Sequence, residues 1–287
     1  MNLSIASKFQ RLAFCLGLFA FAAMTRLPQA QAQFDTADAS ASATPTLHVV
    51  ILIDTSEPKR KADRLIDMQT NLNLMNSVED AMEGELKVNK LIIKDADWSG
   101  DSVIRDCKAL DVKPNDAVYF FYNGHGFRTA SMDADGDTFP AMCLEKDADG
   151  SDGNLKLSNV YKVLKAKNPR LLLVIADTCN SFAPDSWTPA TRGTFRKQWC
   201  KELFVNSRGS YIASGSQPGE YTWTNFTTGS YYTNQLVGNI KRVLSANEYN
   251  EANDGWDAIL KKSCETIRFT SGETQTPQYK NNPSSNN

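Results

Sequence analysis

Histidine is almost absent from this chain, with 2 residues in a sequence of 287. Zinc sites draw on histidine and on cysteine pairs at short spacings, and the 6 cysteines here follow no such spacing. Basic residues are not in excess, because 31 Lys and Arg face 33 Asp and Glu, and they form no strongly basic cluster. A zinc centre and a nucleic-acid partner are therefore both disfavoured.

Long apolar stretches are also missing after the first 32 residues, so no membrane-spanning helix is expected in the mature chain. Residues 1–32 are predicted to be a secretory signal peptide, and an uncleaved anchor is the alternative. They combine the basic Lys8 and Arg11, a short apolar core and the small-residue cleavage pattern Ala30-Gln31-Ala32. The protein is expected to be secreted or periplasmic, with no stable membrane insertion once the signal is removed.

The rest of the chain is expected to form one domain. Residues 33–46 are predicted to be a polar linker, 47–280 the folded domain and 281–287 a disordered tail, and the polar residues after Gly272 are expected to be loose. Apolar runs predict strands over 46–54, 87–95, 117–122, 171–177 and 209–216. Helical spacing of apolar residues predicts helices over 62–80, 101–110, 155–167, 229–244 and 253–267. This alternation indicates an α/β fold with a mainly parallel central sheet covered by helices on both faces.

Two of the predicted strands end in motifs that carry reactive side chains. DAVYFFYNGHG contains His125, and RLLLVIADTCNS contains Cys179. Parallel strands bring their carboxyl ends to one edge of the sheet, where the imidazole and the thiol should meet. A thiol beside a base is the minimum equipment for a cysteine nucleophile. The backbone N–H groups of Gly126 and Cys179 are predicted to bind the oxyanion of such a reaction.

Five cysteines remain after signal removal, and an odd number in an exported protein implies a free thiol. With Cys179 as the nucleophile, the other four can form two disulfides in an oxidising compartment. We expect Cys107–Cys143, which flank the third predicted strand, and Cys200–Cys264, which join the connection 180–207 to the last helix.

YNGHG followed by ADTCNS resembles the caspase-like cysteine peptidases, and among them the metacaspase branch. Segments 213–223, 227–236 and 275–278 resemble further motifs of that family, and the similarity covers about residues 46–280. The resemblance implies a caspase-hemoglobinase-type α/β sandwich and a thiol protease, a hydrolase that acts on peptide or protein substrates through Cys179 and His125. The alternative is a caspase-like pseudo-peptidase that serves as a binding module.

The residues beside these motifs suggest a specificity. In caspases proper, a Gln two residues before the nucleophile and an Arg after the tryptophan of the substrate cleft hold an aspartate at P1, the substrate residue before the cleaved bond. Asp177 and Thr224 stand at those positions here. An acid in place of a neutral group, together with a lost cation, predicts Arg or Lys at P1. Metacaspases carry a second acid at the start of the first helix, for which Asp63 is the best match and Asp67 the alternative.

Three further positions are expected to contact substrate. Tyr221 and Trp223 align with family aromatic residues that form the wall of the S2 subsite, and ordinary core packing is their alternative role. Asn123 stands where metacaspases often have Ser, and it is expected to contact the P1 side chain.

Many metacaspases depend on Ca²⁺ and have an acidic loop after the histidine. Asp133, Asp135 and Asp137 offer alternating hard oxygen ligands at that place, and residues 147–153 are a second candidate. Neither completes an EF-hand, so a solvated acidic turn is the alternative. The chemistry itself requires no cofactor.

The connection 180–207 is long and contains four basic residues that an Arg/Lys-directed site would recognise. It is predicted to be a self-processing loop, and a basic loop that is never cleaved is the alternative. The four residues are Arg192, Arg196, Lys197 and Lys201.

Overall fold

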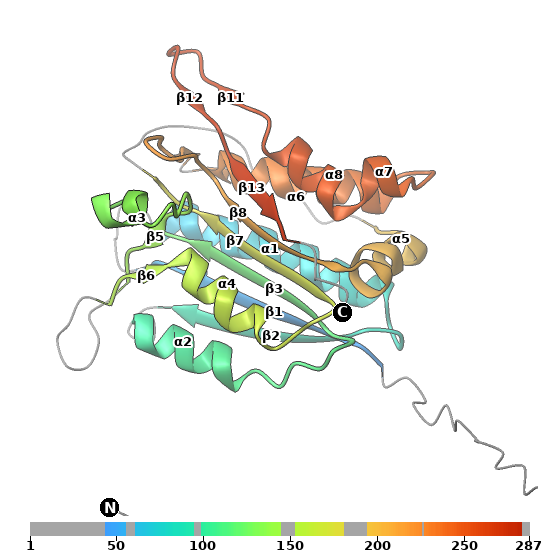
Figure 1. Ribbon diagram of the computed structural model, residues 1–287. Coiled ribbons are helices and arrows are strands. Elements are labelled where there is room, and N and C mark those ends of the chain that lie inside the picture. The colour runs from blue at the N-terminus through green and yellow to red at the C-terminus, as the bar shows by residue number, and fades with distance from the viewer. Residues whose placement is uncertain are drawn as a thin grey trace, which may run out of the picture. The chain divides into compact units, whose positions relative to one another are not determined.

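A six-stranded sheet organises the protein in the computed structural model, which describes residues 44–55, 61–94, 99–144, 153–180, 194–225 and 227–282 (Figure 1). The strand order is β13-β8-β7-β3-β1-β2. The strands are β1 (Thr46–Ile53), β2 (Lys87–Lys94), β3 (Ala117–Asn123), β7 (Leu171–Asp177), β8 (Gly209–Ser214) and β13 (Gln278–Asn281). All neighbours pair in parallel except β13, which runs antiparallel to β8. The predicted α/β class with a mainly parallel sheet is confirmed.

Helices cover both faces of this sheet, which explains why the central strands are apolar at nearly every position. Side chains alternate along each strand, so that Val49 and Ile51 enter one core while Val50 and Leu52 enter the other. The first core lies under α1 (Lys61–Ala81), α6 (Tyr231–Ser245) and α8 (Trp256–Ser263). The second lies under α2 (Gly100–Ala109) and α4 (Leu157–Lys165) (Figure 1).

Short elements occupy the connections between these units. A three-stranded sheet follows β3 and consists of β4 (Gly126–Phe127), β5 (Ala141–Met142) and β6 (Leu155–Lys156). The paired strands are β9 (Thr224–Asn225) with β10 (Gly229–Ser230), and β11 (Ile267–Arg268) with β12 (Thr274–Gln275). The short helical turns are α3 (Ala130–Ala134), α5 (Lys197–Lys201), the π-helical η2 (Glu202–Asn206) and α7 (Glu251–Asp254). No helix within the described ranges has the length and apolar character needed to span a membrane.

The C-terminal segment differs from the sequence prediction, because residues 273–282 are not loose, while residues 283–287 lie outside the described residues. Gln275 is fully buried, and β13 adds an antiparallel edge strand to the sheet. Tyr279 pairs with Ala213 and packs against the core. Backbone pairing and buried amide groups thus hold a segment that apolar periodicity does not reveal.

The second half of the connection 180–207 also differs from an open loop. Residues 197–206 form α5 and η2, and the ammonium groups of Lys197 and Lys201 lie 3.0 and 2.9 Å from the two carboxylate oxygens of Glu85. A peptidase binds its substrate in an extended form, so cleavage after Lys197 or Lys201 would require this helix to unfold. The other predicted cleavage residue in this half, Arg196, caps α5, while Arg192 lies outside the described residues.

The two predicted disulfides are not formed. Cys107, Cys143, Cys179, Cys200 and Cys264 form no disulfide with one another. Cys107 packs in the core under α2 and Cys200 in the opposite core, where each acts as a small apolar side chain. Burial raises the pKa of Cys107, Cys200 and Cys264 to about 12 each, so these thiols are protonated and inert at neutral pH.

Candidate active site

The register of β3 and β7 brings the two sequence motifs to the same height on the sheet. Asn123 pairs with Asp177 as the last pair of the ladder. His125 and Cys179 each follow two residues later, so both lie just beyond the carboxyl edge. His125 is exposed and Cys179 is partly exposed, which leaves both open to a substrate.

Close backbone packing holds these two loops against each other. The hydroxyl of Thr178 donates to the carbonyl of Gly124 at 2.8 Å. A Cβ placed on Gly126 would lie 2.2 Å from Thr178 Oγ1 and 2.7 Å from the carbonyl oxygen of Cys179. Only glycine fits there, and this closeness sets the Gly126 backbone beside Cys179, as the predicted oxyanion site requires.

The backbone at His125 and the thiol of Cys179 have additional partners that the sequence did not reveal. The His125 carbonyl accepts hydrogen bonds from the Tyr122 hydroxyl at 2.6 Å and from the Cys143 N–H at 2.8 Å. The Cys179 thiol donates to the carbonyl of Thr222 at 3.5 Å. The contacts from Cys143 and to Thr222 join residues far apart in the sequence, and no spacing pattern predicts them.

Asp177 is buried next to this edge, and only one of its carboxylate oxygens is satisfied. Oδ2 accepts from the N–H and the hydroxyl of Thr233 at 2.8 and 2.5 Å. Oδ1 has no hydrogen-bond partner among the described residues and faces Gly215, where a Cβ would stand 2.7 Å away. Burial raises the pKa of Asp177 to about 7, although the Thr233 hydrogen bonds oppose the shift.

Two more buried carboxylates accompany Asp177. Asp67 accepts from the N–H and the hydroxyl of Ser230 and from the Asn123 amide at 3.0 Å. Burial, and next the charge of Asp177, raise the pKa of Asp67 well above its usual range. Asp63 accepts from the Thr224 hydroxyl at 2.9 Å and adds to the same electrostatic cluster. Asp67 therefore lies near Asp177 and contacts Asn123, and Asp63 lies near Asp67.

The two predicted aromatic contacts differ in exposure. The Trp223 ring is 3 % exposed and lies 4.7 Å from Phe269, centroid to centroid, while Phe269 packs edge-on against Tyr231. Tyr221 is partly exposed and offers more of its ring to a ligand. Trp223 therefore packs mainly in the protein core, which was the alternative to its predicted place in the S2 wall.

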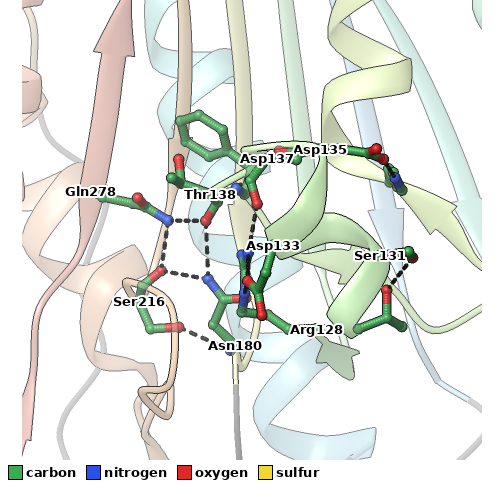
Figure 2. A network of polar contacts seen from close by, with 12 residues as sticks. Arg128, Ser131, Asp133, Asp135, Asp137, Thr138, Asn180, Ser216 and Gln278 are labelled. Atoms are coloured by element: carbon green, nitrogen blue, oxygen red, sulfur yellow. Dashed lines mark hydrogen bonds and ion pairs between the residues drawn. The ribbon is translucent and has the colours of Figure 1, made fainter.

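The three aspartates of the acidic loop point to different protein groups (Figure 2). Asp133 pairs with Arg128 at 2.5 Å, Asp135 with Lys156 at 2.9 Å, and Asp137 accepts from the Ser158 hydroxyl at 2.6 Å. Within the described ranges, no group of three or more His, Cys, Asp or Glu side chains is arranged to hold a metal ion. The loop as folded here does not present a calcium cage, and dependence on calcium stays a prediction. Most of the second candidate, residues 147–153, lies outside the described residues.

A parallel sheet with a thiol and an imidazole at its carboxyl edge defines a cysteine hydrolase of the α/β type, and the comparisons place it more closely. The family model for the caspase domain matches residues 96–287, which include His125 and Cys179. The structure is similar to caspase-1 from Spodoptera frugiperda, with a TM-score of 0.51 and 12% sequence identity over 83% of this chain and 86% of that one. No curated protein matches the chain. The chain belongs to the caspase-domain family. It is a cysteine endopeptidase with the caspase fold, as its sequence motifs predict.

Proposed function

We propose that this protein is an exported, metacaspase-like endopeptidase that cleaves peptide bonds after Arg or Lys with a Cys179/His125 dyad. The observation that carries the specificity is the buried acidic cluster, in which Asp177 Oδ1 lacks a hydrogen-bond donor among the described residues. A buried, half-satisfied carboxylate is costly, and an arriving guanidinium or ammonium would supply both the missing donor and the opposite charge.

The reaction follows from the groups at the sheet edge. His125 takes the proton of the Cys179 thiol, and the thiolate sulfur attacks the carbonyl carbon of the scissile bond. The N–H groups of Gly126 and Cys179 stabilise the oxyanion that forms. His125 then protonates the leaving amine, the C–N bond breaks, and water hydrolyses the thioester to release the acid product and restore the thiol.

The acidic cluster also predicts how substrate and proton binding are linked. A cation bound at Asp177 favours the ionised carboxylate and lowers its pKa. Binding of an Arg or Lys side chain should therefore release a proton near neutral pH and become tighter as the pH rises. The same charge would repel an aspartate at P1.

A fluorogenic peptide library with every residue at P1 tests this specificity. We expect turnover with Arg and Lys, and a loss of about 10- to 100-fold on those substrates in Asp177→Asn and Asp67→Asn, because each removes a charged hydrogen-bond acceptor. Asp254→Asn is the matched control, since Asp254 is also buried but pairs with Arg242 away from this cluster. A wild-type enzyme that cleaves after Asp and ignores Arg would show the specificity to be wrong.

Labelling by an arginyl electrophile directed at cysteine tests the dyad itself. Wild-type protein should be labelled at Cys179, and Cys179→Ala should not be labelled. A wild-type protein that binds arginyl peptides without labelling or turnover would instead be a pseudo-peptidase. Export is tested separately, by sequencing the N-terminus of protein recovered outside the cytoplasm, which should begin near Gln33.

A further inference from the structure

Gln278, at the start of β13, donates hydrogen bonds to two loops next to the nucleophile. Its Nε2 lies 2.7 Å from the carbonyl of Thr138, 3.1 Å from the Ser214 hydroxyl and 3.2 Å from the carbonyl of Ser216. A side-chain amide nitrogen has two N–H donors, so these three acceptors use its full capacity. One side chain of the edge strand thereby joins the loop after His125 to the end of β8 (Figure 2).

Asn180, the residue after the nucleophile, uses the same two carbonyls. Its Nδ2 lies 3.2 Å from the Ser216 carbonyl and 3.4 Å from the Thr138 carbonyl, and its backbone N–H donates to the Ser216 hydroxyl at 3.0 Å. Figure 2 shows the two amides converging on these carbonyls. A shift of either amide would change the position of the other.

Gln275 and Thr276 bind the remainder of segment 215–223. The fully buried Gln275 accepts from the Trp223 N–H at 2.9 Å and donates to the Gly215 carbonyl at 2.8 Å. The N–H and hydroxyl of Thr276 donate to the Glu220 carboxylate at 2.6 and 3.0 Å. The segment is therefore held at both ends and near its middle by three residues of the C-terminal stretch 275–278.

This segment also touches the nucleophile loop directly. The hydroxyls of Thr222 and Ser216 donate to the Thr178 carbonyl at 2.6 and 3.2 Å, and the Thr222 carbonyl accepts from the Cys179 thiol. Segment 215–223 has no helix or strand of its own, so its geometry depends on these partners. Catalysis requires the reacting groups to be held within a fraction of an ångström.

We propose that Gln275-Thr276-Pro277-Gln278 is a clasp that positions Cys179 and segment 215–223 relative to His125, with Gln278 as its positioning residue. This proposal rests on the proposed function in one respect, because it takes the Cys179 thiol to be the nucleophile of the peptidase. The clasp acts through Asn180 and Ser216 and does not itself contact the substrate.

Gln278→Ala tests the clasp, with Gln235→Ala as the matched control. Gln235 is equally half-buried, and its Nε2 also faces three acceptors, the carbonyls of Lys262, Ser263 and Glu265. We expect Gln278→Ala to lower kcat on an arginyl peptide about tenfold with KM within about twofold, and the control to leave both unchanged. Alkylation of Cys179 by iodoacetamide, followed by peptide mass spectrometry, should slow several-fold in Gln278→Ala alone.

A second variant and a double mutant distinguish a positioning role of Gln278 from a general loss of protein stability. Gln278→Glu keeps the stem but sets a carboxylate against the two carbonyls, so it should lose at least as much kcat as Gln278→Ala. Asn180→Ala combined with Gln278→Ala should lose less than the sum of the single effects, because the two amides share acceptors.

The outcomes distinguish the clasp from the peptidase assignment. Equal kcat, KM and alkylation rates in Gln278→Ala and Gln235→Ala would overturn the clasp even if the wild-type enzyme is active. A wild-type protein without turnover would overturn the peptidase proposal, while slower Cys179 alkylation in Gln278→Ala alone would still support the clasp.

Discussion

Replacing Gly126 by Ala should separate the two halves of the dyad without removing a reactive group. The new Cβ would lie 2.7 Å from the carbonyl oxygen of Cys179, where ordinary contact begins at 3.4 Å, and 2.2 Å from Thr178 Oγ1. The Thr178 side chain is itself fixed by its hydrogen bond to Gly124. The overlap cannot be relieved by rotating a flexible side chain, so one of the two loops must move.

The required movement sets the size of the effect. The backbone contact alone falls about 0.7 Å short, and the Thr178 contact falls short by more. A misplacement of about 1 Å in a catalytic site costs roughly 100-fold in rate, which is about 2.7 kcal/mol of barrier. We therefore expect Gly126→Ala to lower kcat about 100-fold, with a smaller effect on KM because Asp63 and Asp67 lie on α1 and Asp177 is held within β7.

Steady-state kinetics on an arginyl peptide, with the folded fraction checked by thermal unfolding, measures this loss. Gly238→Ala is the control, because Gly238 lies in α6 and a Cβ there would meet nothing within 4 Å. It should keep full activity and gain about 0.5–1 kcal/mol of stability. Turnover of Gly126→Ala within about twofold of wild type would refute the idea that this contact fixes the dyad.

Three more results follow from the site. Cys179→Ala and His125→Ala should each lower kcat by about 10³-fold or more, and the double variant should lose little beyond either one; independent, additive losses would contradict a dyad. Because the folded-state pKa of Asp177 is raised to about 7 from 3.8, burial of this group costs no stability below pH 4, and the cost grows as the pH rises to about 7. Between these pH values, the unfolding free energy of wild-type protein should therefore fall relative to that of Asp177→Asn. Over the same range its activity on Arg substrates should rise as Asp177 ionises. Parallel stability curves for the two proteins would contradict the raised pKa of Asp177. A thiol reagent should titrate every cysteine after denaturation and, in the native protein, react last with the three thiols whose pKa is raised, whereas a lower denatured count would reveal disulfides. These three thiols are Cys107, Cys200 and Cys264.

The sheet could be predicted from the sequence wherever burial alone selects the residues. β3 and β7 are buried at all seven positions, and each appears in the sequence as an unbroken apolar run. β13 could not be predicted in the same way, because Gln278 to Asn281 are mostly polar and are held by pairing with β8. β13 adds backbone hydrogen bonds and a single core-packed side chain, Tyr279, so apolar periodicity gives no signal for it.

His125 and Cys179 could be proposed from the sequence because each follows a recognisable strand end, but the residues that hydrogen-bond to the site could not. Asp177 could be proposed because it stands two residues before Cys179 in the sequence, whereas its hydrogen-bond partner Thr233 lies 56 residues further on. The odd cysteine count predicted one thiol left over from two disulfides, but the count gives no geometry, and none of the five cysteines forms a disulfide with another. Cys107 and Cys200 lie in opposite cores, so apolar packing, and not pairing with another cysteine, explains their positions.

The start of α6 explains how the fold tolerates two neighbouring buried acids. Ser230, the N-cap of α6, donates its N–H to Asp67, and Thr233, in the first turn, donates its N–H to Asp177. These amides have no partner within the helix, and the positive end of the helix dipole favours carboxylates near them. One helix terminus therefore stabilises both acids and fixes their orientation. Because the Thr233 donors occupy only Oδ2, the other carboxylate oxygen of Asp177 faces Gly215, where the proposed Arg or Lys side chain would bind. Under the proposed specificity, the cluster is a stability cost in the free enzyme and would become a source of binding energy when that side chain enters.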